Sequence, residues 1–163
     1  MDDAIKARAA WFEDYTARVD HGVVKAANSG TQYTCPCCGY PTLDERGGYD
    51  ICPLCNWEDD GQDDPHADEV WGGPNGRYSL TEARENFKKS LILFGDNDPR
   101  IGGADSALEK QAKESLIEVF EKMRGVNDSS ELAILWSQVN QGRAILYQET
   151  LRKTREFEKQ YKK

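Results

Sequence analysis

Apolar residues recur at helical spacing in several segments of the chain, and the first of these is residues 3–20. Acidic charge stands in its first turn, where a helix dipole favours it. The positions that repeat near a period of 3.6 residues are Ile5, Phe12, Tyr15 and Val19. We predict a helix that ends near Gly22, followed by a linker over residues 26–32 (AANSGTQ).

A second helix is predicted over residues 80–94. Ser79 and Glu82 stand three residues apart before an apolar run, which is the spacing of a capping box. Gly95 and the sequence DNDPR end the pattern. The apolar stripe consists of Leu80, Ala83, Phe87, Leu91 and Phe94.

The C-terminal part of the chain predicts two more helices. One starts with a capping box of Ser106 and Glu109 and closes at Gly125; its face is Leu108, Ala112, Leu116, Val119, Phe120 and Met123. The other starts near Ser129 or Ser130, with a possible bend at Gly142; its face is Leu132, Leu135, Trp136, Val139, Arg143, Leu146 and Tyr147. Beyond Thr150 the sequence LRKTREFEKQYKK is polar and basic, and we expect it to fray or to contact an acidic surface.

Residues 33–75 lack this periodicity and are rich in glycine, proline and aspartate, which indicates loops and short strands. The sequence GGPNG (72–76) is a strong turn signal. We therefore predict an α+β fold that is mostly helical overall, with a small ribbon flanked by helices. The predicted divisions are residues 1–32 (helix and linker), 33–95 (ribbon and following helix) and 96–163 (helical region).

All five cysteines lie in this non-periodic segment. Cys35 and Cys38 form one C-x-x-C pair, Cys52 and Cys55 form another, and thirteen residues separate the pairs. A C-x-x-C turn directs two thiolates inward, so two such turns, with a hairpin tip at ERGG (45–48), build a tetrahedral Cys₄ metal site. Gly39 suits the conformation needed after the second ligand. A site with four protein ligands is closed, so we expect a structural metal.

Zinc is the expected metal, because thiolate tetrahedra favour it. Iron is the less favoured alternative, since the two pairs also resemble those of rubredoxin, whose knuckles are separated by a longer segment. Disulfides are disfavoured by the odd cysteine count and by the absence of an export signal. The fifth cysteine, Cys37, is either a small buried side chain or a reactive thiolate. The negative charge of a Cys₄ centre disfavours a further thiolate beside it and favours the first interpretation.

The sequences YTCPCCGYPTLDERGGYDICPLCNWEDDGQDD and ADEVWGGPNGRYSLTEARENF resemble the bacterial cysteine-rich CPCC domain family over roughly residues 33–95. The resemblance implies a zinc-ribbon-like module with Cys35, Cys38, Cys52 and Cys55 at the metal-ligand positions. It implies no catalytic activity. Residues 1–32 and 96–163 lie outside it.

The net charge of −8 is concentrated near the cysteines, because residues 35–75 hold ten acidic residues and one basic residue. The segment 58–69 is a solvated loop, a calcium loop or a surface that recognises a basic protein; its spacing does not fit a calcium-binding loop. Trp57 either anchors a partner or shelters the metal. The predicted partner-binding residues are Trp57, Glu58, Asp59, Asp60, Asp63, Asp64, Asp68 and Glu69.

The sequence favours an interaction protein over an enzyme or a nucleic-acid reader. Its two histidines, His21 and His66, stand in no nucleophile–base pattern, and the acidic charge of the ribbon repels phosphates. No transmembrane run or secretory signal is present, so a cytoplasmic location and no membrane contact are expected. The predicted function is an immunity-type inhibitor that blocks a basic toxin or enzyme. A non-inhibitory adaptor and a nucleic-acid-binding module are the alternatives.

Overall fold

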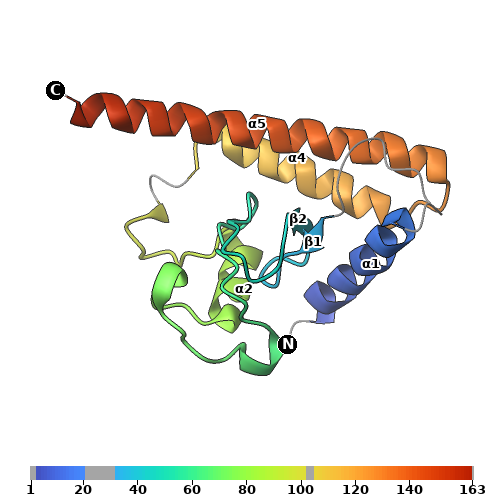
Figure 1. Cartoon of the computed structure of the whole chain (residues 1–163), viewed down its shortest axis with the longest axis horizontal. Coiled ribbons are helices and arrows are strands. Elements are labelled where there is room, and N and C mark those ends of the chain that lie inside the picture. Colours follow the sequence, from blue (N-terminus) through green and yellow to red (C-terminus); the bar gives the residue numbers. More distant parts are fainter. Residues whose placement is uncertain (1–2, 21–31, 102–104, 163) are drawn as a thin grey trace. The chain divides into compact units, whose positions relative to one another are not determined.

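The computed structural model describes residues 3–20, 32–101 and 105–162 (Figure 1). The chain forms two compact units, Met1–Ala104 and Asp105–Lys163, which we call unit 1 and unit 2. The predicted helix stop at Gly22, His21, and residues 26–31 of the predicted linker lie outside the described residues.

Unit 1 combines short elements with long stretches of irregular backbone. In chain order they are α1 (Asp3–Asp20), β1 (Tyr33–Thr34), β2 (Pro41–Leu43), the 3₁₀ turns η1 (Asp64–His66) and η2 (Gly73–Asn75), and α2 (Leu80–Ser90). The strands β1 and β2 pair antiparallel, with Tyr33 opposite Leu43 and an irregularity before Thr34. This hairpin is too small to be stable alone, so other contacts must hold unit 1 together.

Helix α1 packs against the β1–β2 hairpin. The Arg8 guanidinium donates from Nε to the Cys38 carbonyl at 2.9 Å and stacks on the Tyr40 ring, 4.2 Å from its centroid. Gly39 has φ +75°, and a Cβ there would lie 3.0 Å from the Ile5 carbonyl oxygen. The glycine predicted for its backbone freedom is therefore also needed for the close approach of α1.

Helix α2 begins as predicted and ends earlier. Ser79 and Glu82 form the expected capping box. The predicted end near residue 94 is wrong, because Leu91 adopts φ +57° and stops the helix at Ser90. The chain then turns back, and the Leu93 N–H donates to the Cys55 carbonyl at 2.8 Å. The end of α2 is thus set by a tertiary contact with the cysteine segment.

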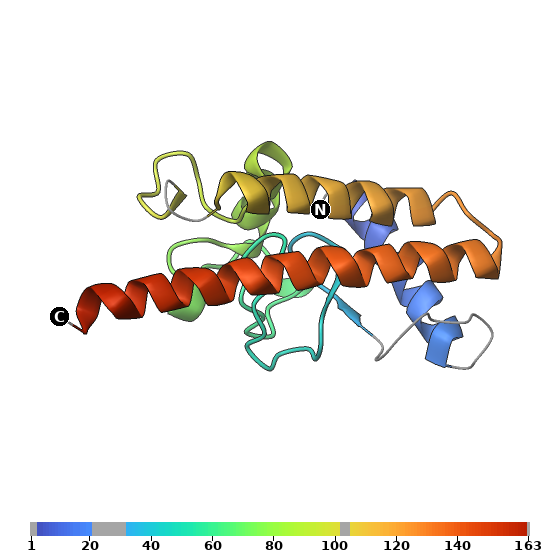
Figure 2. The same cartoon turned by 90° about the horizontal axis from the view of Figure 1, so that it is seen from above.

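Unit 2 is a pair of antiparallel helices, α4 (Ala107–Met123) and α5 (Ser129–Tyr161), seen side by side in Figures 1 and 2. The capping box of Ser106 and Glu109 and the start of α5 at Ser129 are as predicted. The buried apolar side chains are Ala112, Leu116, Phe120, Met123, Leu132, Leu135, Trp136, Val139 and Leu146. These residues form the contact stripe that the periodicity predicts.

Glycine 142 allows close helix packing. A Cβ at Gly142 would lie 3.3 Å from Leu116 Cδ1, so the position serves the approach of α4 to α5. Two residues assigned to the buried faces are exposed instead, Leu108 at 49% and Tyr147 at 62%. Leu146 takes the buried position, and the next residue points about 100° away around the helix.

Of the two outcomes expected beyond Thr150, fraying or contact with an acidic surface, the described residues show a helix that continues to Tyr161 and basic side chains that contact acidic ones. Arg152 pairs with Glu149 at 3.0 Å and with Glu156 at 2.8 Å along the helix. Lys153 pairs with Glu109 on α4. Such pairs at i, i+3 and i, i+4 support a polar helix that its apolar content alone would not predict.

The predicted fold class is confirmed. A two-stranded sheet and a compact cysteine cluster accompany four helices that contain more than half of the described residues. In the part of the chain that the structure describes, every helix is too short or too polar to cross a membrane.

Candidate metal centre

The two cysteine pairs lie in two similar tight turns. In the first, the Gly39 N–H donates to the Cys35 carbonyl at 2.8 Å and the Cys35 N–H donates to the Tyr40 carbonyl at 2.9 Å. In the second, Asn56 and Cys52 make the corresponding bonds, Asn56 N–H to Cys52 carbonyl and Cys52 N–H to Trp57 carbonyl, both at 2.9 Å. We call these turns the first and second knuckle, Cys35–Tyr40 and Cys52–Trp57.

The residue after the second cysteine of each knuckle has a left-handed backbone. Gly39 has φ +75° and Asn56 has φ +64°. Glycine adopts this conformation without strain, and asparagine tolerates it better than most residues. Each knuckle closes its own small turn, whereas the sequence placed both at the ends of one hairpin with its tip at 45–48. The second knuckle is bordered by the bridge between Ile51 and Glu58.

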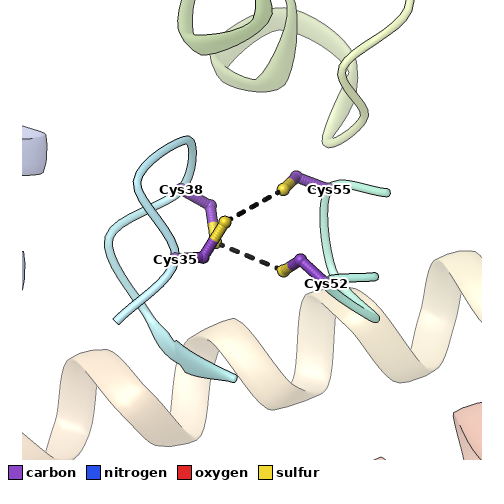
Figure 3. Close-up of side chains that lie close together, drawn as sticks. All are labelled: Cys35, Cys38, Cys52 and Cys55. Carbon is purple, nitrogen blue, oxygen red and sulfur yellow. Dashed lines mark hydrogen bonds between the residues drawn. The ribbon is translucent and has the colours of Figure 1, made fainter. Parts of the chain in front are cut away.

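The four predicted ligands converge. Figure 3 shows the side chains of Cys35 and Cys38 pointing toward those of Cys52 and Cys55 from the opposite knuckle. All four Sγ atoms lie within 4.8 Å of one another, and all four residues are completely buried. The Cys35–Cys55 and Cys38–Cys52 Sγ distances are 3.6 and 3.7 Å. Metal–sulfur bonds of about 2.3 Å in a tetrahedron place sulfur atoms about 3.8 Å apart, so the set fits one metal ion.

Residues 33–97 match the family model described as cysteine-rich CPCC. This match confirms the predicted resemblance, and we call residues 33–97 the CPCC domain. No curated protein and no solved structure matches the chain. The four cysteines of the CPCC domain are therefore positioned to bind a metal, and the family description supports this chemistry.

Polar groups around the sulfur atoms favour thiolates. Thr42 Oγ1 lies 3.0 Å from Cys52 Sγ, and the backbone N–H of Trp57 donates to Cys55 Sγ at 3.5 Å. Hydrogen bonds of this kind fix the orientation of metal ligands and stabilise their charge. Thr42 belongs to β2, and the cysteine spacing gave no signal for its role.

The electrostatics of the centre call for a cation. Burial raises the pKa of Cys35, Cys38 and Cys55 well above the ordinary thiol value. Burial also opposes ionisation of Cys52, but hydrogen bonds from the other three thiols and from Thr42 lower the pKa of Cys52 well below the ordinary value. One thiolate can thus be shared among the group, whereas four thiolates in this dry site require a bound cation.

Cys37 is also completely buried and free. Of the two interpretations offered by the sequence, a small buried side chain agrees with this burial. A reactive thiolate needs access to solvent or substrate, which this position lacks. Cys37 is not one of the four cysteines whose sulfur atoms converge, although its side chain forms a hydrogen bond with Cys55.

Two of the predicted partner-binding residues are in the interior, and the structure corrects their assignment. Trp57 is completely buried at the end of the second knuckle, so the sheltering role applies and the role of exposed anchor does not. Asp59 is also completely buried, and its Oδ2 accepts from Arg46 Nε at 2.9 Å and from the Gly47 N–H at 2.7 Å. The Asp59 carboxylate therefore stabilises the loop between the two knuckles.

Two further carboxylates are paired with arginines. Asp63 lies 2.8 Å from Arg46 Nη2, and Asp64 lies 2.7 Å from Arg84 Nη2. Burial would raise the pKa of Asp63, but hydrogen bonds from Arg46 and the Asp64 N–H outweigh it and lower that pKa. The positive charge beside Asp59 and Asp63 is therefore the Arg46 guanidinium, whereas a calcium loop would need a calcium ion at this place.

Arg84 connects α2 to the first knuckle and to residues 58–69, which we call the acidic segment. Its side chain is 6% exposed, and its Nε donates to the Pro36 carbonyl at 2.9 Å while Nη2 pairs with Asp64. Sequence reasoning missed this residue, because a lone arginine in an amphipathic helix normally faces solvent. The one available signal was its position in the stripe beside Ala83 and Phe87.

The remaining predicted acids are partly or largely exposed. Glu58 and Asp60 are half-buried beside Asn75, whose Oδ1 accepts from the Glu58 N–H at 3.0 Å. Asp68 and Glu69 are exposed, with Asp68 Oδ1 accepting from the Thr81 hydroxyl at 2.6 Å. The acidic segment is thus an ordered part of the CPCC domain, and only some of its charge faces solvent.

Proposed function

We propose that the four-cysteine centre binds one zinc ion as a structural metal. The proposal is carried by the convergence of four buried thiols at tetrahedral spacing. Four cysteines fill a tetrahedral coordination sphere and leave no position for water, so the centre stabilises the fold and has no catalytic role. Zinc is favoured over iron because closed tetrahedral sites of four cysteines are typical of structural zinc.

Metal analysis tests this assignment. The chain is purified after growth with both metals available, and zinc and iron are quantified together with the visible spectrum. We expect one colourless zinc per chain and its loss in Cys52→Ala. Stoichiometric iron with strong visible absorption would contradict the choice of zinc and support the alternative.

We further propose that the zinc-bearing CPCC domain is a protein-interaction module for a basic protein, and that the chain acts as an immunity-type inhibitor of a basic toxin or enzyme in the cytoplasm. Support comes from the charge of unit 1, with nineteen acidic and ten basic residues, and from the hydrogen bonds that fix the backbone around Asp59, Gln62 and Asp63. Such a surface attracts a basic partner and speeds association. It disfavours nucleic acid, because phosphates are repelled.

The partner is identified by capturing proteins from the native cell with the tagged chain at low and high salt. We expect one stoichiometric basic protein whose retention falls as salt rises, because exposed ion pairs are screened. Its activity should fall when the purified chain is added. Binding without inhibition would favour an adaptor, whereas co-purified RNA without a protein would favour a nucleic-acid-binding module.

Charge variants then locate the contact. Asp68→Asn with Glu69→Gln removes charge from two exposed positions of the acidic segment, whereas Glu85→Gln with Asp96→Asn removes the same charge from exposed positions elsewhere in unit 1. We expect the first pair alone to weaken capture. Equal effects of the two pairs would contradict a defined contact on the acidic segment. Asp59 is unsuitable for this test, because its carboxylate is buried and its loss would disturb the fold.

A further inference from the structure

Residues 66–71 form an exposed turn whose backbone is fixed from inside. Gln62 is 1% exposed, and its side-chain Nε2 donates to the carbonyls of His66 and Glu69, both at 2.7 Å. The Ala67 carbonyl accepts from the Thr81 N–H at 2.9 Å, at the start of α2. The turn is therefore held by a buried side chain and by a helix, so binding at this turn would require little further ordering of its backbone.

This turn presents two large apolar side chains to solvent. Val70 is 56% exposed and Trp71 is 45% exposed. The Trp71 indole Nε1 donates to Glu69 Oε2 at 2.9 Å, and the other carboxylate oxygen, Oε1, lies 3.0 Å from His66 Nδ1. The His66 and Trp71 ring centroids are 5.7 Å apart. A chain of side-chain contacts thus orients the exposed indole before any partner arrives.

We propose that Val70 and Trp71, with Glu69 beside them, form the centre of the surface that contacts a basic protein segment. We call these three residues the Trp71 surface. The partner places a lysine or arginine side chain along the indole, with its charged group toward the Glu69 carboxylate. This inference rests on the proposed interaction function and names the part of the CPCC domain that performs it.

The chemistry of the Trp71 surface fits a cationic side chain. Tryptophan is the strongest aromatic partner for a cation, and its face also covers the apolar stem of lysine or arginine. Hydrogen bonds from His66 and Trp71 lower the pKa of Glu69, so its carboxylate is charged near neutral pH. Rigid aromatic residues are also the commonest energetic centres of interfaces.

Charge around the turn selects a basic partner over an acidic one. Residues 35–75 carry ten acidic residues, and their one basic residue, Arg46, is occupied by Asp59 and Asp63. Asp63 and Asp64 are paired with Arg46 and Arg84, whereas the exposed carboxylate of Glu69 contacts His66 and Trp71 of the same turn. We therefore place the centre of the proposed contact at the Trp71 surface and not at the carboxylates that are paired with arginines.

The test titrates the full metal-loaded chain with an oligoarginine peptide, with oligoglutamate as the charge control, and follows the indole N–H signals by NMR. The Trp71 signal is assigned by its loss in Trp71→Phe. We expect this signal to shift with oligoarginine alone, and Trp71→Ala to weaken binding about tenfold. Ile51→Ser is the matched control, because Ile51 is also apolar, 62% exposed and in unit 1. It should bind as the unaltered chain does.

Three results would overturn the inference. If Trp71→Ala binds the peptide normally while Asp60→Asn with Asp68→Asn weakens it, the acidic interaction surface stands and the Trp71 surface does not. No peptide binding by any form at low salt would remove both this inference and the basic-partner proposal. A dimer of the free chain that dissociates in Trp71→Ala would assign the surface to a second copy. Metal content, measured for every variant, shows that the CPCC domain is folded.

Discussion

The two units of this chain are stabilised in different ways. Unit 2 is a helical pair whose apolar stripe repeats every three or four residues, with the Lys113–Asp105 ion pair buried at 2.7 Å near the start of α4. Unit 1 instead gathers buried polar groups around two knuckles, and each of Asp59, Gln62, Asn75 and Arg84 has hydrogen-bond partners. Regular apolar packing stabilises unit 2, whereas specific polar contacts surround the cysteine cluster of unit 1.

This difference has an electrostatic counterpart. Unit 1 has nineteen acidic and ten basic residues and therefore a net charge of −9. Unit 2 has ten acidic and eleven basic residues and therefore a net charge of +1. A domain that relies on a metal tolerates a polar, charged surface, because the metal contributes free energy that a small core does not. We therefore assign the proposed interaction with a basic protein to unit 1.

The largest effect is predicted for Cys52→Ala, which should unfold the CPCC domain of unit 1 and leave unit 2 folded. Cys52→Ala removes one ligand, and we expect loss of the metal and of on the order of 10 kcal/mol of apparent stabilisation, enough to unfold the CPCC domain. Cys37→Ala removes an equally buried cysteine outside the ligand set and should retain the metal. Metal content and NMR spectra distinguish them. Normal metal content in Cys52→Ala would contradict the assigned ligand set.

The next effect is confined to unit 2. Leu116 is 2% exposed and lies against Gly142, so Leu116→Ala should destabilise the helical pair by about 2–5 kcal/mol. Leu108→Ala, at a position that is 49% exposed, should change stability far less. Thermal unfolding followed by helical circular dichroism measures both. Loss of metal in Leu116→Ala would show that the units are not independent.

A smaller effect is predicted for Arg84→Ala in unit 1. The Pro36 carbonyl loses its donor and Asp64 its partner, which should cost about 1–3 kcal/mol while the metal stays bound. Lys88→Ala, on the exposed side of the same helix, is the control. Chemical unfolding of the metal-loaded chain gives the comparison, and equal midpoints would mean that the buried guanidinium is dispensable.

The smallest effect is a pH dependence of unit 2. Burial of Glu109 opposes its ionisation, but hydrogen bonds from Lys153 and the Ser106 N–H outweigh it and lower the pKa of Glu109 below its ordinary 4.5. The stabilisation is therefore complete above pH 4.5 and is lost as the pH falls through the lower folded value. Lys153→Met should reduce this dependence, whereas Lys162→Met should not. Acid unfolding curves of the three proteins provide the measurement.

The predictability of each unit follows from these same interactions. The capping boxes and the stripe of α4 and α5 are local, so sequence spacing predicted them. The convergence of the cysteines was also predictable, because C-x-x-C spacing encodes the turn itself. The end of α2 was not, since Leu91 carries no stop signal and the bond from Leu93 to Cys55 joins distant residues.

The acidic segment shows where sequence reasoning stops. Charge counting found the carboxylates, but their division into buried supports and exposed contacts depends on which arginine reaches them. Arg46 is thirteen residues from Asp59 and Arg84 is twenty from Asp64, and no periodic pattern connects these pairs. The exposed Trp71 and the buried Trp57 likewise stand in similar acidic sequence and differ only through tertiary packing.

The most direct test of a metal-dependent unit 1 is a chelator titration of the full chain followed by two indole N–H signals. Trp57 reports on the second knuckle and Trp136, 3% exposed, reports on the core of unit 2. As metal is withdrawn, we expect the folded Trp57 signal to disappear in proportion while the Trp136 signal persists. Retention of the Trp57 signal after complete metal removal would contradict the account, because the CPCC domain would then fold without its metal.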